Sequence, residues 1–455
     1  MKRKTLLNTL VFTAVLFTSS SLMADVITYW NNVTLDVIRN ERVNPPRATR
    51  MLAMVHIAMY NATNDILNDY EPYPIPYSIE RKVSRLLHLQ SNQARKHASP
   101  DLSASFAAYT VLAYLYPSQS EMLTEKLFYA VLKHKPYRPL KILNSRVWGY
   151  YCALEIILLR RDDGSDDTVE YEPSNELGRW MPTPPNFAPA LLPQWRYVTP
   201  FAMASGDQFI FTDLPALDSE EFALSFNQVK ELGDIDSLIR TPDQTEIAYF
   251  WEDGAGTVTP PGHWQVIAQD ISEMFGLSMM ENARLFALLS IGQADAAITS
   301  WENKYRYDFV RPYTAITGEA AGYGNDLIEI DPDWYNLLPT PPFPSCTSGH
   351  STFSSCSAAI LERFFGTDDI AFSASSPDPE RWPDELPGVV RSWSSFSQAA
   401  EEAGISRIYG GIHWSFDNVG GLQTGRELGY YVFDNFLLPK KVAWKKPWKS
   451  HGHDK

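Results

Sequence analysis

Apolar residues recur at helical spacing along most of this chain, and this periodicity restricts the fold more than any other feature of the sequence. The segment 47–66 is the clearest case, because its apolar side chains follow one face of a long helix. Sustained alternation of apolar and polar residues, the pattern of a half-buried strand, is absent from the sequence. The sequence therefore predicts an all-α protein whose helices pack in two bundles.

A long segment without helical periodicity separates two groups of helices. Residues 162–215 are rich in Pro, Asp, Gly and Trp, which is typical of an ordered connection, and residues 322–344 form a second Pro-rich loop. We therefore predict an N-terminal helical region, residues 25–218, and a C-terminal helical domain, residues 219–438. The expected helices are 27–39, 47–66, 102–116, 119–133 and 139–160 in the first, and 219–232, 242–251, 262–274, 282–300 (continued by 304–317), 350–365, 393–409 and 418–438 in the second.

The first 24 residues have the pattern of a secretory signal peptide. Three basic residues, 2–4, precede a mostly apolar run, Leu6 to Phe17, and the small residue Ala24 marks the expected cleavage site. The alternative, an uncleaved membrane anchor, needs a longer apolar run than this one. We therefore expect an exported protein, periplasmic or secreted, with no transmembrane segment in the mature chain.

The mature chain is expected to be strongly acidic. Removal of residues 1–24 takes away three basic residues and no acidic one, so the net charge falls from −15 to −18. Such a chain is a poor candidate for general nucleic-acid binding. The C-terminal residues 439–455 are basic by contrast and are expected to be a solvated, disordered tail. Contact of this tail with an acidic partner or a membrane surface is the alternative.

The chain has only three cysteines, Cys152, Cys346 and Cys356. Three cysteines are too few for a disulfide scaffold, and their spacing is not that of a zinc site. An oxidising compartment would permit one bond, and the sequence leaves open whether Cys346 and Cys356 pair.

Three stretches carry residues suited to binding and transforming an oxyanion. In the first, Lys304 and Arg311 lie seven residues apart, so both are expected on one face of a helix that Pro312 bends or ends. Two cations on one face suit an oxyanion, although a solvated basic face has the same pattern.

The second stretch is Ser348-Gly349-His350, which follows a Pro-rich approach and begins an apolar helix. A helix start of this kind offers backbone N–H groups, a hydroxyl and an imidazole to an anion. The simpler alternative is a capping serine followed by a surface histidine.

The third stretch, 406–417, contains Arg407, His413 and Asp417. The arginine can bind several oxygens of one anion, and a neutral histidine can ligate a metal or attack phosphorus. Asp417, four residues after His413, can fix its tautomer, although the two could also be a simple surface pair. Three such stretches in one chain favour a common site over three coincidences.

The order and inner spacing of the three stretches are similar to the signature of the vanadium-dependent haloperoxidase and type 2 phosphatidic acid phosphatase superfamily. Thr347 departs from it, because the family usually has proline before Ser-Gly-His. The segments around Asp253-Gly254 and 282–301 resemble the chloroperoxidase branch, and residues 45–64 resemble its soluble bacterial relatives. The resemblance covers most of residues 25–438 and is weakest in 162–215.

This resemblance implies a vanadate cofactor, held in an active site within the C-terminal helical domain. By motif position, Lys304, Arg311 and Arg407 would neutralise the oxyanion. Ser348 and the backbone N–H of Gly349 would bind its oxygens.

The acid–base groups follow from the same motif positions. His413 would be the axial ligand to vanadium, and Asp417 would orient it. His350 would be the acid–base group above the oxyanion. Asp253 is the expected partner of His350.

The implied reaction is oxidation of a halide by hydrogen peroxide to hypohalous acid. Trp301 and Phe343 match positions on the halide side of the pocket. Phe343 favours the chloroperoxidase type, because bromoperoxidase relatives usually have histidine there.

The competing hypothesis is an exported acid phosphatase that acts on phosphate esters without vanadate. His413 would then attack phosphorus, His350 would protonate the leaving group, and Asp417 would orient the nucleophile. A non-catalytic oxyanion-binding protein is a third class. Neither the halide nor the oligomer is given by the sequence, and a homodimer is one expectation for a helical enzyme.

Overall fold

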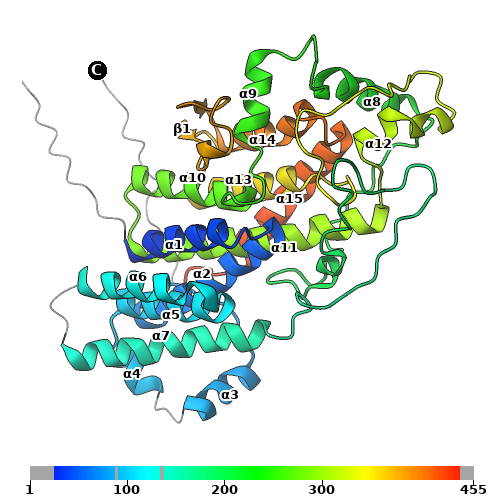
Figure 1. Ribbon diagram of the computed structural model, residues 1–455. Coiled ribbons are helices and arrows are strands. Elements are labelled where there is room, and N and C mark those ends of the chain that lie inside the picture. Colours follow the sequence, from blue (N-terminus) through cyan, green and yellow to red (C-terminus); the bar gives the residue numbers. More distant parts are fainter. Residues whose placement is uncertain (1–24, 88–90, 134–137, 441–455) are drawn as a thin grey trace, which may run out of the picture.

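The computed structural model describes residues 25–87, 91–133 and 138–440. The predicted signal peptide, residues 1–24, lies outside these ranges, as do residues 441–455 of the predicted tail, so both stay predictions. Helices account for nearly all regular structure in the described ranges, which confirms the all-α prediction (Figure 1). None of the helices described there is long and apolar enough to span a bilayer.

Seven helices of the described chain precede the long connection, and their stack is drawn in blue and cyan in Figure 1. The predicted helix 139–160 is observed with those bounds, and the others shift by one or two residues. The short helices α3 and α4 were not predicted. The helices are α1 (Val26–Asn40), α2 (Pro45–Leu67), α3 (Tyr77–Leu87), α4 (Ser91–His97), α5 (Pro100–Leu115), α6 (Ser120–Lys133) and α7 (Pro139–Arg160).

The remaining helices follow the connection, which runs as irregular chain beside both groups in Figure 1. A small antiparallel hairpin, β1 (Phe372–Ser375) with β2 (Val390–Trp393), is the exception that the sequence pattern did not reveal. Its strands are only four residues long, too short for a clear alternation. The helices are α8 (Glu220–Gly233), α9 (Pro242–Phe250), α10 (Thr259–Phe275), α11 (Met279–Tyr307), α12 (Pro312–Thr317), α13 (Gly349–Phe365), α14 (Phe396–Tyr409) and α15 (Ser415–Asn435).

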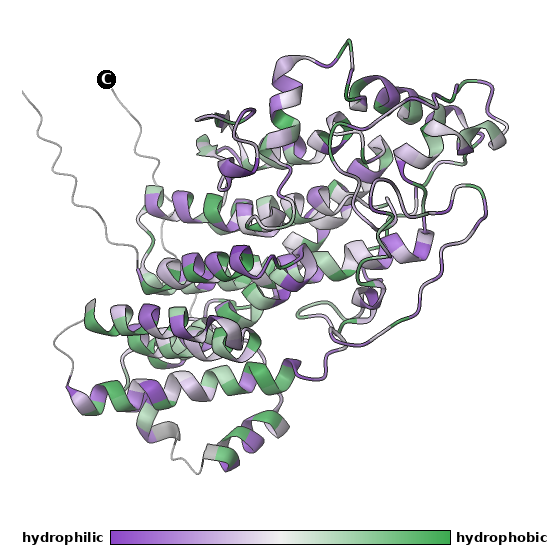
Figure 2. Cartoon of the chain, viewed as in Figure 1, coloured by the Kyte–Doolittle hydropathy of each residue, from purple (hydrophilic) through white to green (hydrophobic). Residues whose placement is uncertain are grey.

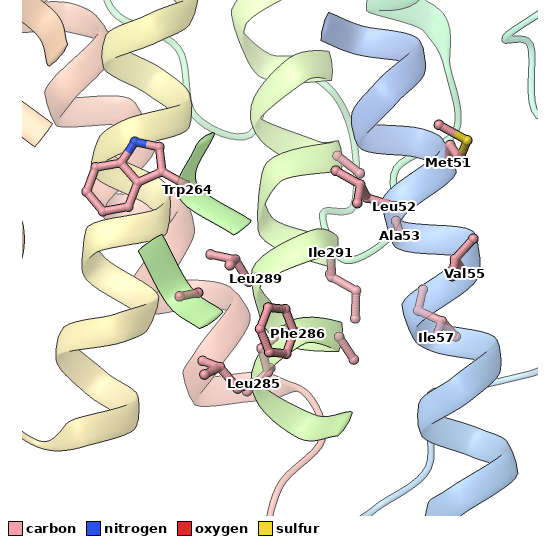
Figure 3. Packing of buried hydrophobic residues seen from close by; sticks show 14 of the residues in the cluster. Met51, Leu52, Ala53, Val55, Ile57, Trp264, Leu285, Phe286, Leu289 and Ile291 are labelled. Atoms are coloured by element: carbon pink, nitrogen blue, oxygen red, sulfur yellow. The ribbon is translucent and has the colours of Figure 1, made fainter. Parts of the chain in front are cut away.

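One hydrophobic core runs through both predicted regions. Helix α11 is buried along almost its whole length and lies between α2 and α13 (Figure 3). Phe286 and Ile291 of α11 share this core with Leu52 and Val55 of α2. Hydrophobic and hydrophilic residues alternate along the outer helices, as amphipathic packing requires (Figure 2). The predicted domain boundary near residue 218 stays a proposal, because one hydrophobic core includes residues from both sides of it.

The prediction that Lys304 and Arg311 share one helix face is wrong. Helix α11 ends at Tyr307, and Asp308 adopts a left-handed conformation with φ of 50°. Pro312 disfavours helical geometry in the residue before it, so Arg311 is extended and caps the new helix α12. The two cations therefore approach the site from different elements.

A run of glycines brings α15 against α13, where two parts of the expected site begin. A Cβ atom at Gly421 would lie 2.7 Å from the carbonyl oxygen of Ser348, and one at Gly429 would lie 2.6 Å from that of Cys356. Gly425, between them, is equally close to the α13 backbone. Only glycine permits this approach, which places the start of α15 beside the start of α13. All three cysteines are buried free thiols, so Cys346 and Cys356 do not pair.

Replacing Gly425 by alanine should force α15 away from α13. Overpacking of this kind costs about 1–3 kcal/mol of unfolding free energy. Gly318→Ala is the control, because a Cβ atom there meets nothing within 4 Å. Urea denaturation of both variants measures the difference, and equal stability of Gly425→Ala and the wild type would contradict the tight packing.

Candidate oxyanion-binding site

The structure brings the three predicted stretches together at the ends of five helices. All of the expected cationic, histidine and carboxylate groups, except the partly exposed His350, are buried there. Lys304 lies in the last turn of α11, Arg311 precedes α12, Ser348 to His350 begin α13, Arg407 lies in the last turn of α14, His413 precedes α15, and Asp417 lies in the first turn of α15. The grouping of residues more than a hundred positions apart excludes the interpretation as separate surface features.

His413 is held in one tautomer by Asp417. Its Nδ1 lies 2.9 Å from Oδ2 of Asp417, which also accepts the backbone N–H of Trp414 at 3.1 Å. The ring proton therefore resides on Nδ1, and Nε2 carries a lone pair. Burial, and then the cation of Arg311, lower the pKa of His413 well below its ordinary value. The neutral ring is thus prepared to donate electrons from Nε2.

Lys304 fixes the loop that leads into α13. Its Nζ donates to the backbone oxygens of Pro344 at 3.2 Å, Ser345 at 3.0 Å and Thr347 at 2.5 Å. Burial, followed by repulsion from Arg311, lowers the pKa of Lys304 well below its ordinary value. The ammonium group is therefore a loop anchor as well as a positive charge at the site.

The two arginines are held mainly by backbone oxygens. Arg311 donates from Nε to Phe343 at 2.8 Å and from one terminal nitrogen to Ile412 at 2.6 Å. Arg407 donates from a terminal nitrogen to Trp251 at 2.9 Å, and its buried Nε has no acceptor among the described residues. Burial lowers the pKa of both guanidinium groups. Carbonyl dipoles fix these cations without cancelling their charge.

The start of α13 adds hydrogen-bond donors to the cations. Ser348 caps the helix, and its N–H donates to the Asp417 carbonyl at 2.9 Å. In the described chain, the N–H groups of Gly349 and His350 have no protein acceptor. A Cβ atom at Gly349 would meet nothing closer than 3.6 Å, at Phe353, so packing alone does not require glycine here. A helix N-terminus of this kind attracts anions.

The expected pairing of His350 with Asp253 is wrong. Nε2 of His350 lies 3.3 Å from the backbone oxygen of Glu252. The carboxylate of Asp253 instead contacts Nδ1 of His263 at 3.1 and 3.3 Å. Asp253 has a positive φ of 46°, and this backbone turn accompanies the contact with His263. No motif in the sequence links Asp253 to a histidine ten residues later.

A cleft of about 410 Å³ leads to this group of residues. His350 and Arg407 line it, together with Phe343. Its other walls are mostly proline-rich chain from residues 183–191 and 339–342. The first of these segments belongs to the connection in which sequence patterns indicated no role.

Two aromatic rings lie beside the cations. The ring centroids of Trp301 and Phe343 are 5.0 Å apart. Lys304 Nζ lies 4.9 Å from the Phe343 ring centre, and the central guanidinium carbon of Arg311 lies 5.0 Å from it. Trp301 is anchored by a 3.1 Å hydrogen bond from its indole nitrogen to the Leu191 oxygen. Phe343 thus forms an apolar boundary between the cleft and the two cations.

The chain is similar to known proteins in sequence and in fold. Residues 284–438 match the family model described as the VCPO second helical-bundle domain. The chain is also 25% identical over 497 residues to vanadium chloroperoxidase from Curvularia inaequalis, an alignment that covers 86% of this chain and 78% of that protein. The matched family region includes all three stretches.

Solved structures give a similar result. The crystal structure titled as the first bacterial vanadium-dependent iodoperoxidase superposes with a TM-score of 0.76 and 27% identity, covering 91% of this chain and 98% of that one. The apo-type bacterial vanadium-dependent chloroperoxidase has a TM-score of 0.66 at 17% identity, covering 86% and 94% of the two chains, so that likeness concerns the fold.

The lowered pKa of Lys304 predicts a pH-dependent affinity for anions. Only the protonated ammonium attracts an anion, so affinity should fall as pH rises through a range below the ordinary lysine value of 10.5. Calorimetric titration of the protein with inorganic phosphate between pH 6 and 10 should show this decline. Lys304→Met should bind more weakly throughout and lose this part of the pH dependence. An unchanged affinity and slope in the variant would remove Lys304 from the site.

Proposed function

We propose that this chain, a member of the vanadium-dependent haloperoxidase family, oxidises a halide with hydrogen peroxide to hypohalous acid. One observation carries the proposal. His413 carries a lone pair on Nε2, which faces a terminal nitrogen of Arg311 at 3.1 Å within a buried group of three cations, and Asp417 fixes its ring. This arrangement suits an oxyanion whose central atom accepts a nitrogen ligand.

Vanadate is the cofactor that these relatives imply, and the residues present fit it. The buried Nε of Arg407 and the first N–H groups of α13 are donors in need of an acceptor. The excess of buried positive charge suits an anion that carries several oxygens. When bound, vanadate supplies a Lewis-acidic centre that activates peroxide.

We assign the binding roles by position in the site. Lys304, Arg311 and Arg407 would neutralise the oxyanion, and Ser348 and the backbone N–H of Gly349 would hydrogen-bond its oxygens. These contacts act inside a buried site, where electrostatic interactions are stronger than in water.

The acid–base roles belong to three other residues. His413 would ligate the bound oxyanion's central atom through Nε2, and Asp417 keeps its Nδ1 protonated and its ring oriented. His350 lies at the cleft and moves protons there. Burial, and then the positive charge of Arg407, lower the pKa of His350, so that the free ring is a neutral base.

The halide is proposed to approach along the cleft beside Phe343 and Trp301. The exposed edge of Phe343 lines the cleft, whereas Trp301 supports it from behind. An apolar boundary excludes water, so it disfavours a strongly hydrated anion more than a large, weakly hydrated one. The phenylalanine favours the chloroperoxidase type, and the relatives named above include both a chloroperoxidase and an iodoperoxidase.

The comparisons do not favour the alternative phosphatase, because the named relatives are haloperoxidases. Export to the periplasm or medium remains our proposal from the pattern of residues 1–24. A homodimer is likewise a proposal, which gel filtration of the mature chain would test.

The enzyme assay separates the two reactions on one preparation. Protein loaded with orthovanadate should halogenate monochlorodimedone in the presence of peroxide and iodide, bromide or chloride. The same protein without vanadate should hydrolyse p-nitrophenyl phosphate slowly or not at all. Clear phosphatase turnover without halogenation would overturn the proposal.

His413→Ala should abolish retained vanadate, measured as vanadium content after gel filtration, because the nitrogen ligand is lost. His97→Ala is the matched control, since His97 is exposed on α4. Full vanadium retention by His413→Ala would show that the ligand is a different residue.

A further inference from the structure

The segment between α9 and α10, residues 251–258, holds two residues of the site through consecutive carbonyl groups. The Trp251 oxygen accepts from Arg407 at 2.9 Å, and the Glu252 oxygen lies 3.3 Å from Nε2 of His350. No other hydrogen bond to the Arg407 guanidinium occurs in the described chain. The position of both side chains therefore depends on where this segment, named here the 251–258 strap, lies.

The strap is not in a relaxed backbone conformation. Asp253 has a φ of 46°, and Thr259, where the strap joins α10, has a φ of 69°. Non-glycine residues seldom adopt positive φ, and β-branched residues least of all. Such strain persists only where surrounding contacts hold the chain. The strap therefore needs external anchors.

Its principal anchor is the carboxylate of Glu252. Arg381 donates to it from two nitrogens, at 3.1 and 3.2 Å, and the Trp382 indole donates at 3.3 Å. The N–H of Gly254 adds a 2.9 Å hydrogen bond within the strap. Only 8% of the Glu252 side chain is exposed, against 36% for Arg381, so the carboxylate end of this forked ion pair is buried and its contacts are directional.

A second contact comes from the same turn as Arg381. Asp378 accepts the N–H of Val258 at 2.8 Å and also pairs with Arg39 of α1. Asp378 and Arg381 both lie between β1 and β2, in the hairpin connection that helical periodicity did not predict. An irregular surface segment thus fixes the strap at both ends.

We propose that Glu252, held by Arg381, is a positioning residue that sets the placement of His350 and Arg407. The carboxylate fixes the backbone of Glu252. The backbone oxygen of Glu252 contacts His350, and that of the preceding residue, Trp251, accepts from Arg407. This role rests on the proposed function. Arg381 then influences anion binding, although it lies at the cleft rather than among the buried cations.

The test compares Arg381→Met with Arg381→Lys. Loss of the fork should raise the Kd for inorganic phosphate roughly tenfold in the vanadate-free protein, the scale typical of outer contacts to ligating groups. The kcat of the vanadate-loaded enzyme should fall as well. Lysine, which can restore the charge but not the fork, should recover part of both losses. If Arg381 contributed only to stability, Arg381→Met and Arg381→Lys would not differ in phosphate Kd or kcat when their melting temperatures are equal.

Arg306→Met is the matched control. The Arg306 side chain is 41% exposed and pairs with Glu302, which is 7% exposed, whereas the values are 36% and 8% for Arg381 and Glu252. The control should keep wild-type phosphate affinity. If Arg381→Met does not fold, Glu252→Gln carries the test, because it keeps the size of the side chain and loses its charge.

Wild-type phosphate affinity in both Arg381→Met and Glu252→Gln would overturn the inference. Weakened phosphate binding in these variants, together with a wild-type protein that does not halogenate, would support the positioning role and reject the proposed function. Halogenation by the wild type, together with wild-type phosphate affinity in both variants, would support the proposed function and reject the positioning role.

Discussion

The cost of burying three cations side by side governs the organisation of this molecule. Lys304, Arg311 and Arg407 are almost fully removed from water, and burial disfavours their charged forms, with added repulsion from neighbouring cations at Lys304 and Arg311. The protein stabilises them with backbone carbonyls and with the carboxylate of Asp417. Carbonyls provide direction but no formal charge, so a strong attraction for anions remains. An oxyanion site is the chemical consequence.

Such a site requires backbone held firmly from several directions, and the fold supplies it through helix ends. Helix α11 passes through the common core and carries Lys304, while glycine packing brings α15 close enough for Asp417 to accept the Ser348 N–H. Stability and chemistry are coupled here, because the same helix contacts that bury apolar surface also set distances among the charged groups.

Sequence reasoning identified the helices and the three stretches because both are local patterns. Periodicity predicts an amphipathic helix such as α7, and motif spacing predicts groups such as His413 with Asp417. It failed where two local rules conflicted: Lys304 and Arg311 have helical spacing, but the residue before Pro312 must be extended. Contacts between irregular segments, such as Glu252 with Arg381, leave no periodic trace. The true partner of Asp253, His263 of α10, was missed because no sequence motif links the two residues.

Packing of the core helices holds one part of the site, and polar contacts between irregular segments hold the other. Lys304, His413 and Asp417 lie on or beside the core helices, so moving them would require repacking of apolar surface. His350 begins a core helix too, but its ring and the guanidinium of Arg407 meet the 251–258 strap, which polar contacts hold. Ion pairs can be exchanged without rebuilding a core. The positions of Lys304, His413 and Asp417 are therefore constrained by the fold. The placement of His350 and Arg407 can change with the hairpin connection that anchors the 251–258 strap.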